Sequence, residues 1–131
     1  VTTLATASLL YIFIYLCAPA VTAVFNGGHD QTLASYAQSG LRLYFTGFFF
    51  AGMNIVGTAA LSAVESAKFA FAASIMRGFI AIILFAFALS AILGMTGVWL
   101  AFPAGEFVTL FITSAGLIQI LKNHTKYISA N

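Results

Sequence analysis

The chain has 131 residues, of which 62% are hydrophobic and 6% are charged. A typical soluble domain carries about 25% charged residues, whereas here five basic and three acidic side chains would have to cover the whole surface. So few charges exclude a soluble enzyme, a nucleic-acid-binding protein and a disordered chain, because large apolar patches would be left in water. The composition therefore predicts a protein whose main partner is the lipid bilayer.

Long charge-free runs predict an all-α membrane protein with four transmembrane helices. A helix that crosses a bilayer needs about 20 predominantly apolar residues, and irregular backbone is not stable in contact with lipid. A short amphipathic segment, residues 31–39, leads into the second span, and residues 94–97 are expected to form a tight turn. Residues 122–131 are expected to be a polar tail. The predicted spans cover residues 4–25, 41–64, 67–93 and 98–121.

The basic residues predict the orientation in the membrane, because cytoplasmic loops carry an excess of Lys and Arg. Lys68 and Arg77 follow the turn between the second and third spans, and Lys122 and Lys126 lie in the C-terminal tail. These two regions share a side, and only Arg42 belongs to the opposite one. We therefore expect a multi-pass protein of the cell membrane with a cytoplasmic C-terminus.

The start of the chain carries an expectation of its own. Val1 stands directly against a hydrophobic helix, with no initiator methionine before it. A cleaved signal peptide does not fit, because the first span has no basic segment before it and is longer than a signal sequence requires. We therefore expect this chain to follow the N-terminal part of a longer protein.

A stripe of small and polar residues runs along one face of the second span. Its members are spaced by four, three, four and four residues, so that they share one side of a helix: Gly47, Ala51, Asn54, Thr58 and Ser62. Small residues let another helix approach closely, and polar ones supply interhelical hydrogen bonds. Helix packing is the favoured interpretation. A substrate-lining face is the alternative, because an amide such as Asn54 in the middle of a membrane needs a partner or water.

Two charged residues lie well away from the ends of the predicted spans. Arg77 is either an anchor whose long stem reaches the interface or a wall residue of a cavity open to the cytoplasm. Glu106 is costly at its position unless it is protonated, paired or hydrated. It is therefore either a proton carrier or a residue of an outer vestibule that orients the helix. The sequence has no clustered acid–base set, phosphate-binding loop or metal-ligand pattern, so neither an enzyme nor a resident cofactor is expected.

Three segments carry a resemblance to a known family. They are residues 41–44 (LRLY), residues 74–78 (SIMRG) and residues 94–106 (GMTGVWLAFPAGE). In this order and spacing they resemble the C-terminal lobe of the multidrug and toxin extrusion (MATE) transporters, in particular the sodium-driven MepA-like bacterial branch. The resemblance implies twelve helices in two six-helix lobes, of which the four spans would be helices nine to twelve.

The resemblance also implies a function. MATE-type transporters are antiporters that export cationic or amphipathic drugs and toxins as Na⁺ or H⁺ enters. The partners of this chain would then be small organic cations, the missing N-terminal lobe and the remaining helices. The coupling carboxylates of the family lie on helices of the N-terminal lobe or on helices seven and ten, but residues 43–64, the counterpart of helix ten, contain no Asp or Glu. The coupling ion is therefore expected to bind mainly outside this chain, with Asn54, Thr58, Arg77 and Glu106 as candidates for lining a cavity.

Two other interpretations stay open. A lipid-linked oligosaccharide flippase of the same superfamily would need more basic residues along its cavity to bind anionic headgroups. In this chain Arg77 is the one candidate. A self-contained four-span protein could be a small exporter or a structural membrane subunit. A small exporter would need a carboxylate deep in a span, and the first three predicted spans have none.

Overall fold

The computed structural model describes residues 2–26, 30–64 and 67–129, the last seven of them by their backbone only. The rest of the first loop, part of the turn after the second span and the end of the expected tail lie outside the described residues. Within the described ranges the chain is almost entirely helical, and no strand occurs there. The elements are α1 (Thr2–Phe25), α2 (Gln31–Phe45), α3 (Gly47–Ala63), α4 (Ala67–Ile75), the π-helical segment η1 (Met76–Ile80), α5 (Ala81–Leu93) and α6 (Met95–Ser129).

Four helical stretches are long and apolar enough to cross a membrane. They run over Thr2–Phe25, Gln31–Ala63, Ala67–Leu93 and Met95–Lys122. The prediction of four apolar helices is therefore confirmed, and their bounds lie close to the expected ones except in the second and fourth.

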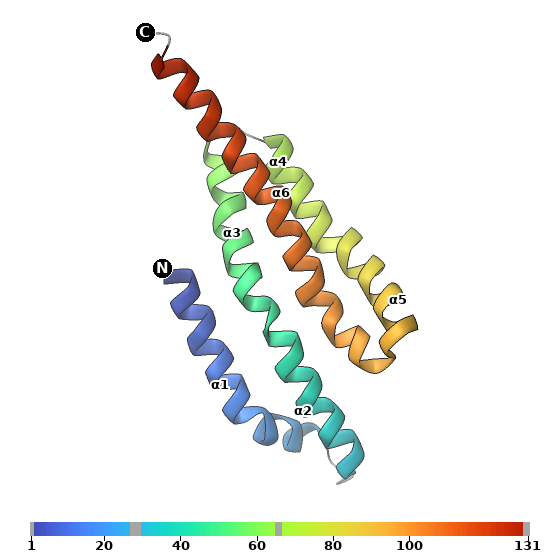
Figure 1. The fold of residues 1–131 in the computed structure, drawn as a ribbon. Coiled ribbons are helices and arrows are strands. Elements are labelled where there is room, and N and C mark those ends of the chain that lie inside the picture. The colour runs from blue at the N-terminus through green and yellow to red at the C-terminus, as the bar shows by residue number, and fades with distance from the viewer. Residues whose placement is uncertain (1, 27–29, 65–66, 130–131) are drawn as a thin grey trace.

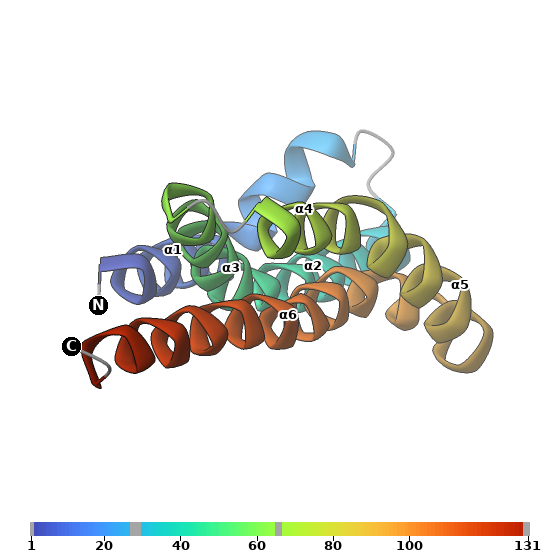
Figure 2. The ribbon, with the colours of Figure 1, turned by 90° about the horizontal axis from the view of Figure 1, so that it is seen from above.

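Helix α6 is at the centre of the bundle. It packs against α3, α5, α2 and α4, while α1 lies against α2 and α3. Figure 1 shows that α3 and α6 run in the same direction, whereas α1 and the α4–α5 arm run in the opposite one. Seen from above, α6 passes along the length of the bundle beside α3 and α4 (Figure 2). This arrangement brings the middle of α3, of the α4–α5 arm and of α6 together.

The second helical stretch differs from the expected approach segment followed by a separate span. Asp30 caps α2 by accepting hydrogen bonds from the backbone N–H groups of Thr32 and Leu33. The helix then continues past residue 39 and is interrupted only at Thr46, whose hydroxyl donates to the carbonyl oxygen of Leu43 at 2.6 Å. The backbone N–H of Thr46 donates to the same carbonyl at 3.2 Å, and because this backbone bond spans three residues instead of four, it tightens one turn without ending the helix.

The turn before α6 is shorter than expected. Gly94 has a φ of +60° and a ψ of −136°, which an L side chain rarely adopts, and it reverses the chain alone. Helix α6 therefore begins at Met95 rather than at Val98. Gly97 lies inside it, against the backbone of Leu89 where a Cβ atom would collide with the carbonyl oxygen. At its other end, α6 remains helical through Ser129, where a polar tail was expected.

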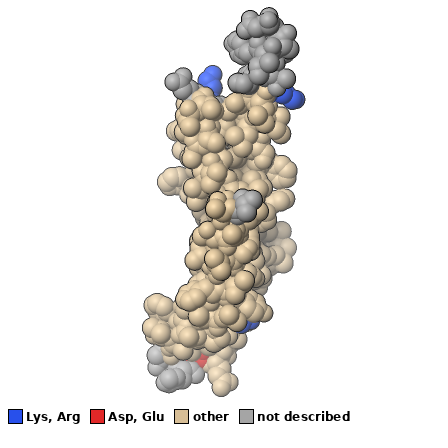
Figure 3. All heavy atoms as spheres, turned by 90° about the vertical axis from the view of Figure 1, so that its left-hand side faces the viewer, with Lys and Arg blue, Asp and Glu red and all other residues tan. Residues whose placement is uncertain are grey.

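The core is built from small side chains, and the outside is apolar. The buried hydrophobic residues are mostly alanines, which let helix backbones approach closely. Large side chains such as Leu16, Phe87 and Ile92 are more than two-thirds exposed. Figure 3 shows a broad face without charge, with Lys and Arg side chains near its ends. This distribution fits a bundle surrounded by lipid or by further helices.

Candidate functional site

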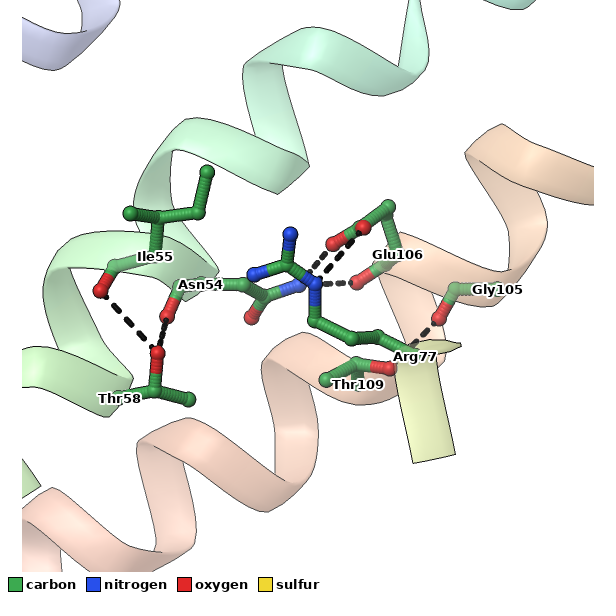
Figure 4. A network of polar contacts seen from close by, with 7 residues as sticks. All are labelled: Asn54, Ile55, Thr58, Arg77, Gly105, Glu106 and Thr109. Carbon is green, nitrogen blue, oxygen red and sulfur yellow. Dashed lines mark hydrogen bonds and ion pairs between the residues drawn. The ribbon is translucent and has the colours of Figure 1, made fainter. Parts of the chain in front are cut away.

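A charged side chain of α6 is buried in the middle of the bundle. Glu106 is only 3% exposed, although it carries a carboxylate near the centre of an apolar span. Its Oε1 atom lies 3.2 Å from Nε of Arg77 in η1, and its Oε2 atom accepts a hydrogen bond of 2.8 Å from the amide of Asn54 in α3. Figure 4 shows these three side chains pointing toward one another from three helices. We call Asn54, Arg77 and Glu106 the polar triad.

Asn54 joins α3 to α6 through two hydrogen bonds. Its side-chain nitrogen donates to the carboxylate of Glu106 and also to the backbone carbonyl of the same residue, both at 2.8 Å. Both partners are acceptors, so the NH₂ group must face them and the amide cannot be flipped. Its carbonyl oxygen is consequently buried without a hydrogen-bond partner among the described residues, and the whole residue is 0% exposed.

Arg77 reaches Glu106 from a π-helical turn. Such turns are rare and occur mostly as single bulges in α-helices, frequently at functional sites. The Arg77 side chain is 27% exposed, so it is only partly withdrawn from its surroundings. The guanidinium meets Glu106 through Nε, and Figure 4 shows its terminal amino groups turned away from the carboxylate. Arg77 therefore neutralises Glu106 on one side and presents free donors on the other.

Arg77 and Glu106 were expected to have separate roles, but in the structure they form one ion pair. Glu106 is enclosed between helices, so it does not stand in an open outer vestibule. Arg77 is not stretched toward an interface, because the carboxylate of Glu106 offers a partner inside the bundle. It lines a groove, and a cavity open to the cytoplasm stays a prediction.

Thr58 and Ser62 lie apart from the triad. The hydroxyl of Thr58 donates to the backbone carbonyl of Asn54 at 2.7 Å, and that of Ser62 donates to the carbonyl of Thr58 at 2.9 Å. Thr58 therefore touches a triad residue only through the backbone of its own helix. Ser62 is exposed among the described residues, so its place in the packing stripe stays a prediction.

The buried face of α3 turns away from the predicted stripe after Asn54. It consists of Gly47, Ala51, Asn54, Gly57 and Leu61. Their spacings of four, three, three and four residues average 3.5 residues per step, slightly less than the 3.6 residues of one α-helical turn, so that they stay on one side of the helix. The predicted stripe, with more four-residue steps, drifts around the helix instead and reaches the surface at Ser62.

Two threonines of α6 extend the polar seam, and neither was among the residues predicted from the sequence. Thr109 is 0% exposed and donates to the carbonyl of Gly105 at 2.9 Å. Thr113 is 1% exposed, and its hydroxyl has no hydrogen-bond partner among the described residues. Glu106, Thr109 and Thr113 are spaced by three and four residues. This helical period was a signal that could have placed them on one face.

A groove of about 560 Å³ lies beside the triad, between α1 and α3. Threonines of α1 form one wall, and aromatic rings of α2, α3 and α6 form another. Arg77 is the one charged residue that lines it among the described residues. The full lining is Thr2, Thr3, Thr6, Ala7, Leu10, Tyr44, Phe48, Ala51, Gly52, Ile55, Arg77 and Phe102.

Comparisons with protein-family models, curated proteins and solved structures find no match to this chain. The chemistry of the site must therefore be read from its own residues. In the part of the chain that the structure describes, no three His, Cys, Asp or Glu side chains gather in a way that could hold a metal ion. The triad combines one acid, one base and one amide, which can hold helices together and can exchange partners with a charged ligand.

Proposed function

We propose that this chain belongs to the C-terminal six-helix lobe of a MATE-type secondary antiporter. The whole protein would export cationic or amphipathic organic molecules in exchange for Na⁺ or H⁺. In this proposal the chain lies in the cell membrane with its C-terminus in the cytoplasm. It works with the N-terminal lobe and the remaining helices of the same transporter.

The observation that carries the proposal is the polar triad, in which Asn54 and Glu106 are buried and Arg77 is partly exposed. A charged residue at the centre of a transmembrane helix costs about 2.5–3.5 kcal/mol on insertion scales, and such residues usually serve transport or signalling. Here two opposite charges lie within candidate spans, 3.2 Å apart. Arg77 lies in residues 74–78 and Glu106 ends residues 94–106, and both segments carry the MATE resemblance.

Within such a transporter, the triad would act as a clamp between helices. Asn54 ties α3 to α6, and Arg77 ties the α4–α5 arm to the same carboxylate. A lobe that rocks during alternating access must move as one body, and a buried, mutually bonded set of polar groups resists sliding of its helices. Because Arg77 already compensates Glu106, the coupling ion is assigned to the part of the transporter outside this chain.

The test is transport by the full-length protein that contains this chain, reconstituted in liposomes. Inward gradients of Na⁺ and of H⁺ are imposed separately, and efflux of tetraphenylphosphonium is followed. We expect one of the two gradients to drive efflux. Efflux whose rate depends on neither gradient, or efflux by residues 1–131 alone, would contradict the proposal.

The Glu106→Gln variant tests the role of the clamp. We expect its transport rate to fall by about 2- to 30-fold, the range for residues that transmit conformational coupling, while its dependence on the ion gradient is kept. Asp30→Asn is the matched control, because it also converts an acid to its amide but lies outside the apolar spans and keeps a good helix cap. Loss of the pH dependence in Glu106→Gln would instead make this residue a proton carrier and overturn the clamp.

A further inference from the structure

We infer that the groove beside Arg77 binds the anionic head of an amphipathic molecule, a carboxylate or phosphate carried on an apolar body. The inference goes beyond the proposed antiport, because the organic cations of that proposal would not be the ligands of this site. It rests on the unused donors of Arg77, on the lining of the groove and on the direction in which the ion pair points.

Arg77 has hydrogen-bond donors that the ion pair does not use. A guanidinium carries five N–H groups in a rigid fork, and the ion pair with Glu106 is made through Nε. The terminal amino groups have no hydrogen bond to any of the described residues, and Figure 4 shows them directed away from Glu106. Donors in an apolar setting need an acceptor, and a carboxylate or phosphate can accept two parallel bonds from a guanidinium.

Aromatic rings of the groove can hold the apolar body of the ligand. The rings of Tyr44 and Phe102 are stacked with centroids 4.5 Å apart, and Phe48 lies against Phe102. These rings line the groove together with Arg77, so an apolar body can pack on them while its head meets the guanidinium. The volume of about 560 Å³ lies within the range of small-molecule sites, about 300–1,000 Å³.

The charge that faces the groove is positive. Glu106 is 3% exposed and does not line the groove, whereas Arg77 is 27% exposed and does. The pair therefore presents its positive end to any molecule in the groove. A cation would meet the guanidinium first and would have to displace it, while an anion is attracted without any change in the pair.

Photolabelling of the full-length protein in a non-ionic detergent tests the inference without any ion gradient. Three probes with the same diazirine-bearing alkyl chain are used: a fatty acid, a phosphatidic acid and a primary amine. We expect the two anionic probes to label residues 2–10 and 48–55, and the amine to label them about tenfold less. The stronger of the two anionic labels identifies a soluble acid or a lipid headgroup as the source.

Variants separate the site from a general loss of folding. The double variant Arg77→Gln/Glu106→Gln removes both charges, so that no buried carboxylate is left unpaired, and anionic labelling should fall about tenfold with the charge-assisted bonds. Glu106→Gln alone keeps Arg77 and should label at least as strongly as the parent protein. Arg42→Gln is the matched control, because Arg42 lies over the Tyr15 ring at 4.3 Å and does not line the groove.

Two results would overturn the inference. One is equal labelling of the groove by the amine and by the acids. The other is unchanged anionic labelling in the double variant while the protein remains folded, as judged by its elution as a single species. Transport measured in parallel keeps the two proposals apart, because the groove can fail to bind an anion in a protein that still exchanges ions for drugs.

Discussion

The amide of Asn54 fixes how Glu106 is held. Because its nitrogen donates to both the carboxylate and the backbone carbonyl of Glu106, it selects one conformation of that side chain. Arg77 then meets a carboxylate that is already oriented. The buried carbonyl of Asn54 is the remaining unsatisfied group of this arrangement, and such a group in a native protein commonly marks a strained or functional place.

The ion pair leads to a prediction about stability. Arg77→Gln should lower the free energy of unfolding by about 3 kcal/mol, because it leaves the carboxylate of Glu106 buried without its counter-charge. Arg77→Gln/Glu106→Gln should lose much less, since neither charge remains. Denaturant unfolding in detergent, followed by circular dichroism, measures the difference. A double variant as unstable as Arg77→Gln would show that the unpaired carboxylate of Glu106 is not the cause of the loss.

The sequence singled out both members of the pair but did not bring them together. Each was recognised as a costly charge inside an apolar span, and each was given its own set of roles. Whether Arg77 meets Glu106 depends on the rotation of the α4–α5 arm against α6. A shift of one residue turns a helix by about 100°, and both the π-helical turn at η1 and the one-residue turn at Gly94 change this rotation. Neither feature is visible as a hydrophobic pattern.

At the scale of elements, glycines set how closely α3 and α6 approach. Gly57 lies directly against Thr113, where a Cβ atom would collide with the side-chain methyl group. Gly78, in η1, has open space around its Cα atom. The same residue type therefore serves a close helix contact at one position and no packing contact at the other.

These two glycines form a matched pair of variants. Gly57→Ala should lower the stability of the bundle by about 1–3 kcal/mol, because it forces apart two helices in contact. Gly78→Ala should be neutral or slightly stabilising, since alanine favours a helix and meets no neighbour there. Thermal unfolding of the purified variants in one detergent compares them directly. A larger loss in Gly78→Ala than in Gly57→Ala would contradict the described packing.

The helices themselves were largely predictable, and their irregularities were not. Runs without charge are enough to predict four apolar helices, because backbone in lipid has few alternatives. The continuous stretch through Thr46, the π-helical turn and the start of α6 at Met95 depend on local backbone geometry and on neighbouring helices. Of the predicted packing stripe, Gly47, Ala51 and Asn54 lie on the buried face of α3. Farther along α3, Gly57 and Leu61 are buried in place of the predicted Thr58 and Ser62.

At the scale of the whole molecule, the face seen in Figure 3 carries Lys and Arg side chains near its ends, whereas Arg77 and Glu106 pair inside the bundle. This arrangement, together with the excess of basic residues on one side, leads to a prediction about topology. Cysteines are introduced one at a time at Gln31, Lys68 and Lys122, all exposed in the structure, in a background where Cys17 and any other cysteines are replaced. A membrane-impermeant maleimide should label position 31 in intact cells and positions 68 and 122 only after permeabilisation.

The opposite pattern of labelling would reverse the orientation while leaving the helix order intact. Labelling of positions 31 and 68 from the same side would contradict the crossing by α2 and α3. In that case the prediction of four spans would fail, whatever the activity of the protein.

The second helical stretch is longer than a membrane requires. Gln31–Ala63 contains 33 residues, which corresponds to about 50 Å of helix, whereas the hydrocarbon core is about 30 Å thick. If α3 is embedded, much of α2 must stand beyond the lipid, stiffened by its Asp30 cap and held by α1 and α6. A rigid helix that projects from the membrane is a suitable epitope for structural work. An antibody fragment raised against α2 would be held rigidly relative to the bundle. It would therefore serve as a fiducial marker for particle alignment in single-particle microscopy.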